Sequence, residues 1–127
     1  MTYVDANHVL RWFLEDVPGQ LRRVRDLLNH AEPATLCLSS VTIAEITYVL
    51  RGMTYDHRQV AEVIEGFCAY ESVKLPSAID RAALRIFVET TLDYEDCYLI
   101  AQALATGVSI ATFDTQLMKI FKTYSNT

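Results

Sequence analysis

Hydrophobic residues in this chain of 127 residues follow two patterns, short continuous runs and stripes at helical spacing. The continuous runs are short enough for strands and lie at residues 2–4, 35–38, 73–75 and 108–111. The stripes repeat an apolar residue every three or four positions, which predicts amphipathic helices. These helices are expected over residues 7–14, 21–28, 43–52, 60–67, 77–87, 95–106 and 114–121.

Short strands that alternate with helices predict an α/β domain built on a parallel sheet. The helix at 95–106 is apolar on almost every side, so we expect it to be central and buried. Gly107 suits the position just after its last turn. Ser77, with Asp80 three residues later, suits the start of the preceding helix. The Pro-Gly pair at 18–19 predicts a turn.

Composition narrows the class of protein. The net charge is -5, from 11 Lys and Arg against 16 Asp and Glu, which argues against a protein that coats nucleic acid with a basic surface. Three widely spaced cysteines do not form the pattern of a disulfide framework or a zinc site. The first residues lack the basic and apolar regions of a signal peptide, so we expect a cytoplasmic protein.

Acidic residues stand where a parallel sheet forms its ligand sites, at the carboxyl ends of the strands. Asp5 ends the first apolar run, and Asp114 follows the last run closely. Glu45 lies early in a helix that follows a strand, so the start of that helix falls at the same edge. Asp96 lies at the start of the buried helix.

These acids have a structural and a chemical interpretation. Helix starts favour carboxylates, and the positions that match an N-cap or a capping box are Asp5, Asp114, Thr42 with Glu45, and Asp93 with Asp96. Several carboxylates at one edge would also repel one another, because a pair about 4 Å apart costs about 4 kcal/mol at an effective dielectric of about 20. Bound Mg²⁺ or Mn²⁺ would relieve that repulsion, so the pattern suggests a metal site.

Four segments carry a family resemblance: residues 3–7 (YVDAN), 39–45 (SSVTIAE), 94–101 (YEDCYLIA) and 111–114 (ATFD). In this order they resemble a PIN domain, and within that superfamily the VapC-type toxin ribonucleases of type II toxin–antitoxin pairs. The resemblance implies a single domain over residues 1–127, a three-layer α/β/α fold with a central parallel sheet of four or five strands. It also implies an antitoxin partner and a homodimer.

The activity that the resemblance implies is an endoribonuclease dependent on Mg²⁺ or Mn²⁺, which leaves a 5′-phosphate and a 3′-hydroxyl. The residues that match the catalytic and metal-binding acids are Asp5, Glu45, Asp96 and Asp114. Asn7 and Thr112 match the polar positions that orient the first and last acids. Asp93 is an additional acid, although an N-cap role would explain it fully.

Basic side chains are candidates for contact with RNA phosphates. The candidates are Arg11, Arg22, Arg23, Arg25, Arg51 and Arg58, with Arg11 and Arg51 preferred. Charged residues of this kind are more often solvated helix faces. His8, near Asp5, is a further candidate for a substrate contact. Cys97 follows the third acid, but without a visible Cys–His pair a thiol nucleophile is not expected.

Two other functions fit parts of the pattern. A catalytically silent PIN-like binding module would share the fold, although all four acids are present. A phosphoacceptor receiver domain has a similar length, a parallel sheet and an acidic Mg²⁺ site. It would want an acid pair after the first strand and a lysine after the last, and the sequence has neither.

Overall fold

The computed structural model describes residues 1–126, and the chain divides into two compact units. The first unit is Met1–Pro76, and the second begins at Ser77. In the described residues the longest helices have 13 residues. Each of these helices is too short or too polar to span a lipid bilayer.

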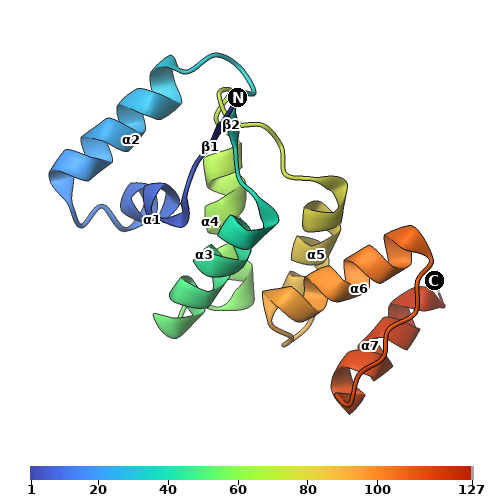
Figure 1. The fold of residues 1–127 in the computed structure, drawn as a ribbon. Helices are drawn as coiled ribbons and strands as arrows, with labels where there is room; N and C mark the ends of the chain where they lie inside the picture. Colours follow the sequence, from blue (N-terminus) through green and yellow to red (C-terminus); the bar gives the residue numbers. More distant parts are fainter. Residues whose placement is uncertain (127) are drawn as a thin grey trace. The chain divides into compact units, whose positions relative to one another are not determined.

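The first unit has a small parallel strand pair with four helices (Figure 1). Its elements are β1 (Thr2–Tyr3), α1 (Ala6–Leu14), α2 (Pro18–His30), β2 (Leu36–Cys37), α3 (Ser40–Gly52) and α4 (His57–Cys68). Thr2 pairs with Leu36 and Tyr3 with Cys37, and Val73 adds a single parallel bridge to Leu36.

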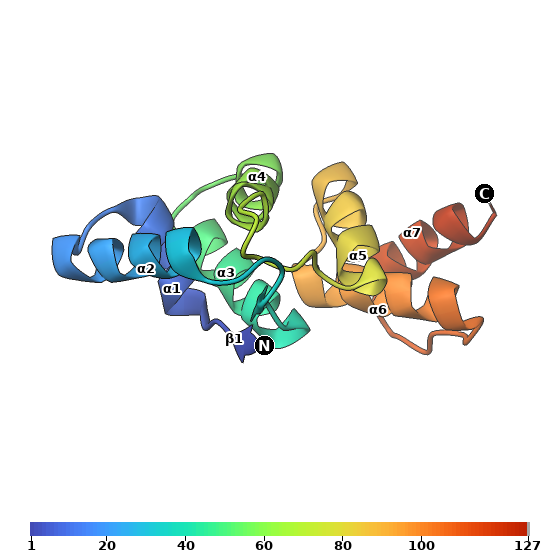
Figure 2. The same ribbon diagram turned by 90° about the horizontal axis from the view of Figure 1, so that it is seen from above.

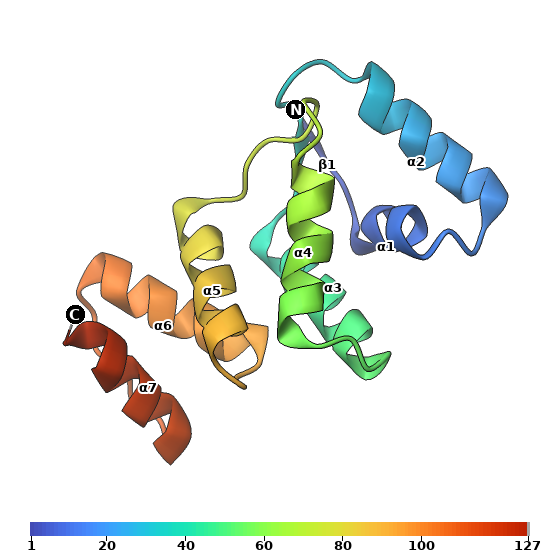
Figure 3. The same cartoon turned by 180° about the vertical axis from the view of Figure 1, so that it is seen from behind.

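The core of the first unit lies between α1, α3 and α4. In Figure 3 α4 lies in front of α3, and in Figure 1, which is the opposite view, α3 lies in front of α4. Side chains that are almost fully buried there are Val9, Ile43, Ile46, Leu50, Val60, Ile64 and Phe67. Trp12 joins α1 to α4, because its ring meets Phe67 edge-on at 5.5 Å and its Nε1 donates to the Tyr70 hydroxyl at 3.1 Å.

The second unit is helical in its described part. It contains α5 (Ala78–Glu89), α6 (Tyr94–Thr106) and α7 (Thr115–Ser125), and α5 crosses α6 at close range (Figure 2). The side chains buried in it include Ala83, Phe87, Cys97, Ile100 and Leu117. The expectation of a buried helix at this place is confirmed for the inner face of α6, whereas Leu99 and Leu104 on the same helix are exposed.

A buried carboxylate joins the starts of α5 and α6. Asp80 is 2% exposed, and its Oδ1 accepts from the Tyr94 hydroxyl at 2.6 Å while Oδ2 accepts from Ser77 Oγ at 2.8 Å. Burial and the hydrogen bond to Asp80 both raise the pKa of the Tyr94 hydroxyl, which therefore stays protonated and donates. Because a buried polar group needs hydrogen-bond partners, this network holds the first turn of α6 in place.

The seven helices predicted from hydrophobic spacing are present, and two details of their ends differ from expectation. Ser77 caps α5 as predicted, but Asp80 turns its carboxylate to hydroxyl donors instead of completing a capping box. The Pro-Gly pair at 18–19 is not a turn but the first residues of α2, since Pro18 at the first helical position needs no N–H partner. Gly107 ends α6 with a left-handed φ of 70°, as predicted.

The predicted sheet is only partly present. Residues 73–75 contribute one bridge, and residues 108–111 form no strand in the part of the chain that the structure describes. Val108 is 61% exposed, and its N–H bonds to Ala103 at the end of α6. An extended segment becomes a strand only when its backbone bonds to a neighbouring strand, so an apolar run alone does not make one. The four- or five-stranded sheet and the three layers are therefore not confirmed.

Removal of the Tyr94 hydroxyl should destabilise the protein. In Tyr94→Phe the buried Asp80 carboxylate loses a donor, so we expect the free energy of unfolding to fall by about 1–3 kcal/mol. Urea denaturation measures this change. Tyr98→Phe is the matched control on the same helix, because no hydrogen bond of that hydroxyl is found among residues 1–126, and its effect should stay within about 0.5 kcal/mol. Equal losses in the two variants would contradict the proposed role of Asp80.

Candidate functional site

Asp5 stands between β1 and α1 and is the N-cap of α1. Its Oδ1 accepts from the backbone N–H of His8 at 3.1 Å and lies 2.8 Å from His8 Nδ1. The side-chain hydrogen bond from His8 is the largest cause that lowers the pKa of Asp5. The carboxylate is 69% exposed, so it is ionised and open to solvent at neutral pH.

Glu45 projects from α3 and is exposed. The predicted capping box of Thr42 with Glu45 is wrong, because α3 begins earlier: Ser39 is the N-cap and its Oγ accepts from the Thr42 N–H at 3.2 Å. The side chain of Glu45 makes no hydrogen bond or ion pair within residues 1–126. Its carboxylate therefore has no side-chain role in holding the described part of the fold together.

Asp93 and Asp96 lie at the start of α6, and neither forms the predicted capping box. Asp93 has the extended backbone of an N-cap, with φ -66° and ψ 157°, but its side chain makes no cap hydrogen bond. The prediction that capping fully explains Asp93 is therefore wrong. Asp96, in the first turn, is half-buried.

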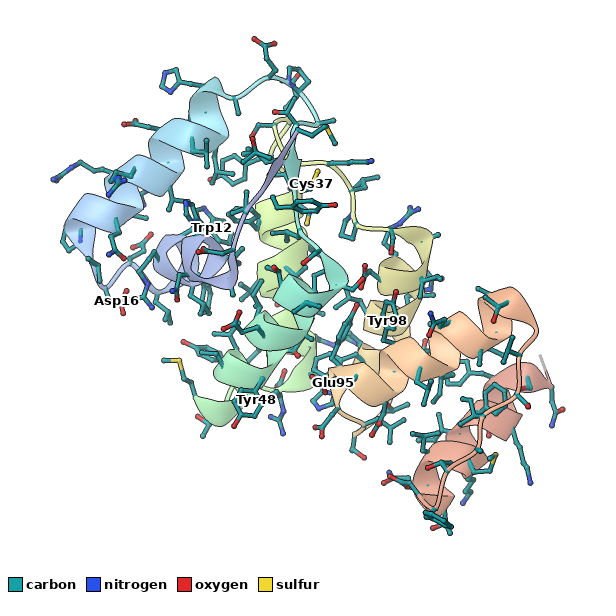
Figure 4. All side chains as sticks on the ribbon, viewed as in Figure 1. Trp12, Asp16, Cys37, Tyr48, Glu95 and Tyr98 are labelled. Atoms are coloured by element: carbon teal, nitrogen blue, oxygen red, sulfur yellow. The ribbon has the colours of Figure 1, made fainter. Side chains whose placement is uncertain are left out.

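The surroundings of Asp96 oppose the ionisation of its carboxyl group. Burial is the largest cause that raises the pKa of its carboxyl group, followed by the negative charges of Asp93, Asp114 and Glu95. Glu95 is the next residue back along α6 (Figure 4). The second unit thus brings Asp93 and Asp114 close enough to Asp96 for their charges to oppose its ionisation.

Asp114 is the N-cap of α7. Its Oδ1 accepts from the Leu117 N–H at 3.0 Å, and its own N–H donates to Thr112 Oγ1 at 3.0 Å. Thr112 therefore orients the backbone of this acid. Asn7 acts on the first acid through its backbone N–H, which also lowers the pKa of Asp5.

The predicted site residues divide between the two units. Asp5, Asn7 and Glu45 belong to the first unit, and Asp93, Asp96, Thr112 and Asp114 belong to the second. Within neither unit do three or more His, Cys, Asp or Glu side chains of the described residues gather as a group that could hold a metal ion. Carboxylate oxygens are nevertheless the ligands that hard cations such as Mg²⁺ prefer. A bound cation would also offset the negative charges that oppose the ionisation of Asp96.

The preferred arginines have different surroundings. Arg51 donates from Nη1 to the Tyr55 carbonyl oxygen at 2.7 Å, so it closes the end of α3. Arg11 Nη1 lies 3.3 Å from Asp16, just after α1 (Figure 4), while its Nε is buried without a hydrogen-bond partner in the described structure. Sequence reasoning missed Gln20, which lines a cavity with Arg11. No signal in the sequence marked it, because Gln20 lies just before the helix predicted over residues 21–28, although α2 begins at Pro18 and includes it.

Cys97 is not a nucleophile in this structure. Its side chain is fully buried, and its Sγ contacts the Leu92 carbonyl oxygen at 3.9 Å. Burial is the main cause that raises the pKa of the thiol to about 12, so the reactive thiolate is scarce at neutral pH. The expectation from the sequence agrees with this environment.

Comparison with known proteins supplies a family assignment. A model described as the PIN domain matches residues 2–122, which is nearly the whole chain. Searches of the curated proteins and of the solved structures find no match.

Neutralising Asp96 should stabilise the metal-free protein at neutral pH. A carboxyl group whose pKa is raised by folding ionises more easily in the unfolded chain, so the folded state loses stability as pH rises from the usual Asp value of 3.8 through the folded pKa. Asp96→Asn removes this loss. We expect its unfolding midpoint in urea, with EDTA present, to exceed the wild-type midpoint at neutral pH and to lose that advantage in acid.

Glu62→Gln is the control for net charge, because Glu62 is exposed on α4 in the first unit. It should not reproduce the pH-dependent gain. A midpoint of Asp96→Asn that stays parallel to the wild type across the pH range would show that folding does not raise the pKa of Asp96.

Proposed function

The chain belongs to the PIN domain family, which is generally a family of nucleases, and from this premise we propose that the protein is a metal-dependent endoribonuclease. The observation that carries the metal dependence is the raised pKa of Asp96, whose ionisation is opposed first by burial and then by the charges of Asp93 and Asp114. Carboxylates in this condition either take up protons or attract a cation. Hydrolysis that leaves a 5′-phosphate and a 3′-hydroxyl needs an activated water, and a bound cation would supply one by lowering the pKa of that water.

We assign the metal-binding and catalytic roles to Asp5, Glu45, Asp96 and Asp114, with Mg²⁺ or Mn²⁺ as the ion. When bound, the ion would lower the pKa of its water and neutralise charge on the phosphate that is cleaved. Asp93 is an additional acid, since its carboxylate is free of the capping bond. Asn7 and Thr112 support the first and last acids through the backbone contacts described above.

Helix capping does not compete with this role. The hydrogen bonds of Asp5 to His8 and of Asp114 to Leu117 all use Oδ1. A carboxylate has two oxygens with about four acceptor positions in total, so the same side chain can cap a helix and bind a cation. The N-cap bond also fixes the side chain in one orientation, which favours ligation.

The finer assignment is the toxin of a toxin–antitoxin pair. It is supported by the resemblance of four ordered segments to VapC-type toxins. With it we propose a cognate antitoxin that binds the protein, a homodimer and a cytoplasmic RNA substrate. Arrest of growth on expression, relieved by co-expression of a small open reading frame found beside the gene, would test this assignment separately from nuclease activity.

Purified protein should cleave a mixed cellular RNA pool when Mg²⁺ or Mn²⁺ is added and should stop when EDTA is added. Asp5→Asn and Asp114→Asn test the acids better than alanine does, because asparagine caps a helix about as well as aspartate and so preserves the fold. Each variant should lose about 100-fold or more of the cleavage rate, the scale found when a group that stabilises transition-state charge is removed. Gel analysis of end-labelled RNA measures the rate and the 5′-phosphate products.

Glu45→Gln and Glu62→Gln form a matched pair for the same assay, since both replace an exposed helical glutamate. Only Glu45→Gln should lose activity. Cleavage that survives EDTA, or that is equal in the two variants, would overturn the proposed mechanism. Folded protein that cleaves no RNA with either metal would favour the silent PIN-like binding module.

Mg²⁺ should also stabilise the folded protein, with no substrate present. A ligand at about 100 times its dissociation constant adds about 2.7 kcal/mol to the free energy of unfolding. Differential scanning fluorimetry should show a rise in Tm with Mg²⁺ that is reduced in Asp96→Asn. If Mg²⁺ changes the Tm of the wild type and of this variant equally, Asp96 does not bind the ion.

A further inference from the structure

A cavity of about 230 Å³ opens in the first unit where α1 faces α2. The residues that matter for its chemistry are Asp5, Asn7, Arg11, Gln20 and Arg23. We call it the α1–α2 cavity. Two guanidinium groups and two amide side chains make it rich in hydrogen-bond donors, and Asp5 places it beside an acid of the proposed catalytic set.

Arg11 has a donor that the protein does not satisfy. Its side chain is 22% exposed, and its Nε is buried without a hydrogen-bond partner in the described residues. Asp16 meets the other end of the guanidinium, at Nη1, with a separation of 3.3 Å. The guanidinium group has five N–H donors, so its pair with Asp16 at Nη1 leaves donors for an oxyanion bound in the cavity that Arg11 lines.

Arg23 has a positive charge that the protein does not pair. Among the described residues the ion pairs of α2 involve Arg25, which lies 3.0 Å from Glu15, and not Arg23. Arg23 is exposed and lines the cavity from α2. Because Asp16 pairs with Arg11, Arg23 is the positive charge of this lining that has no ion-pair partner among the described residues.

We propose that the α1–α2 cavity binds a phosphate group of the RNA strand through Arg11 and Arg23, with Gln20 as a neutral donor. The proposal rests on the proposed function for its substrate class. The planar guanidinium fork matches the oxygens of a phosphate, and the volume is several times the share of about 30 Å³ that one water takes in the liquid. Neither arginine is a catalytic residue here, because their part is to position the strand.

The chemistry separates this role from that of the acids. A phosphate contact carries no sequence information, so it strengthens binding to all RNA sequences alike. Loss of one contact should raise KM and leave kcat nearly unchanged, whereas loss of an acid lowers kcat. It should also reduce the dependence of RNA affinity on salt concentration by about one unit of slope.

The first test uses inorganic phosphate with metal-free protein in EDTA, followed by amide and arginine-side-chain NMR. Wild-type protein should show concentration-dependent shifts at the Gln20 amide and the Arg11 Nε–H. Arg23→Gln should weaken the apparent affinity by about tenfold, the effect of losing one charge-assisted bond. Arg22→Gln is the matched control, because Arg22 is the adjacent exposed arginine of α2 and does not line the cavity.

The second test measures the affinity of the same three proteins for a short RNA in EDTA, at several salt concentrations. Arg23→Gln should reduce the salt slope by about one, and Arg22→Gln should reduce it less. Absence of phosphate shifts in the wild type, or equal losses in the two variants, would overturn the proposal. Phosphate shifts without a change in the RNA slope would also overturn it, because the cavity would then bind free phosphate and not the strand.

Both tests are independent of cleavage. A protein that binds phosphate and RNA as expected but cleaves nothing with Mg²⁺ would retain the α1–α2 cavity as a binding site and lose the proposed catalytic function. A protein that cleaves RNA without phosphate shifts would retain the function and lose this site. The two failures are therefore distinguishable.

Discussion

The first turn of every helix exposes backbone N–H groups that have no partner within the helix, and the need to satisfy them decides how this chain uses its acidic side chains. Side chains accept these bonds at α1, α3, α4, α5 and α7. Two of the acceptors are Asp5 and Asp114, which are also candidate ligands. Their orientation is therefore set by local hydrogen bonds before any ion binds.

The start of α6 obeys a different constraint. Asp93 occupies the N-cap position without forming the bond, and Asp96 follows in the first turn with its ionisation opposed by burial and by neighbouring carboxylates. The place of this turn is held by Tyr94, whose hydroxyl donates to the buried Asp80. The buried hydrogen bonds of Asp80 thus stabilise a turn of α6 that holds several negative charges. Local rules are broken in this way mainly at functional sites.

The helices were predictable because their apolar residues recur every three or four positions, and that period depends only on local geometry. Gly107 was predictable for a similar reason, since its left-handed φ is a local requirement of the helix end. The capping box of Thr42 with Glu45 failed because the sequence offers Ser39 three residues earlier, and the helix starts there. Spacing alone does not choose between two acceptable N-caps.

The strands show where sequence reasoning ends. Residues 35–38 became part of a parallel pair, whereas residues 108–111, with a similar apolar run, did not form a strand in the described chain. Both runs have side chains suited to a sheet, but strand formation requires backbone partners from distant parts of the chain.

The sequence by itself determined the helices, several of their caps and the family resemblance of the ordered acids, because these depend on residues close together along the chain. Only the tertiary structure decided that Asp93 is free of its cap, that Asp96 is crowded, and that Arg11 and Arg23 share a cavity. Charge, burial and hydrogen bonding act through space, and their balance at a residue is set by neighbours that the sequence does not place.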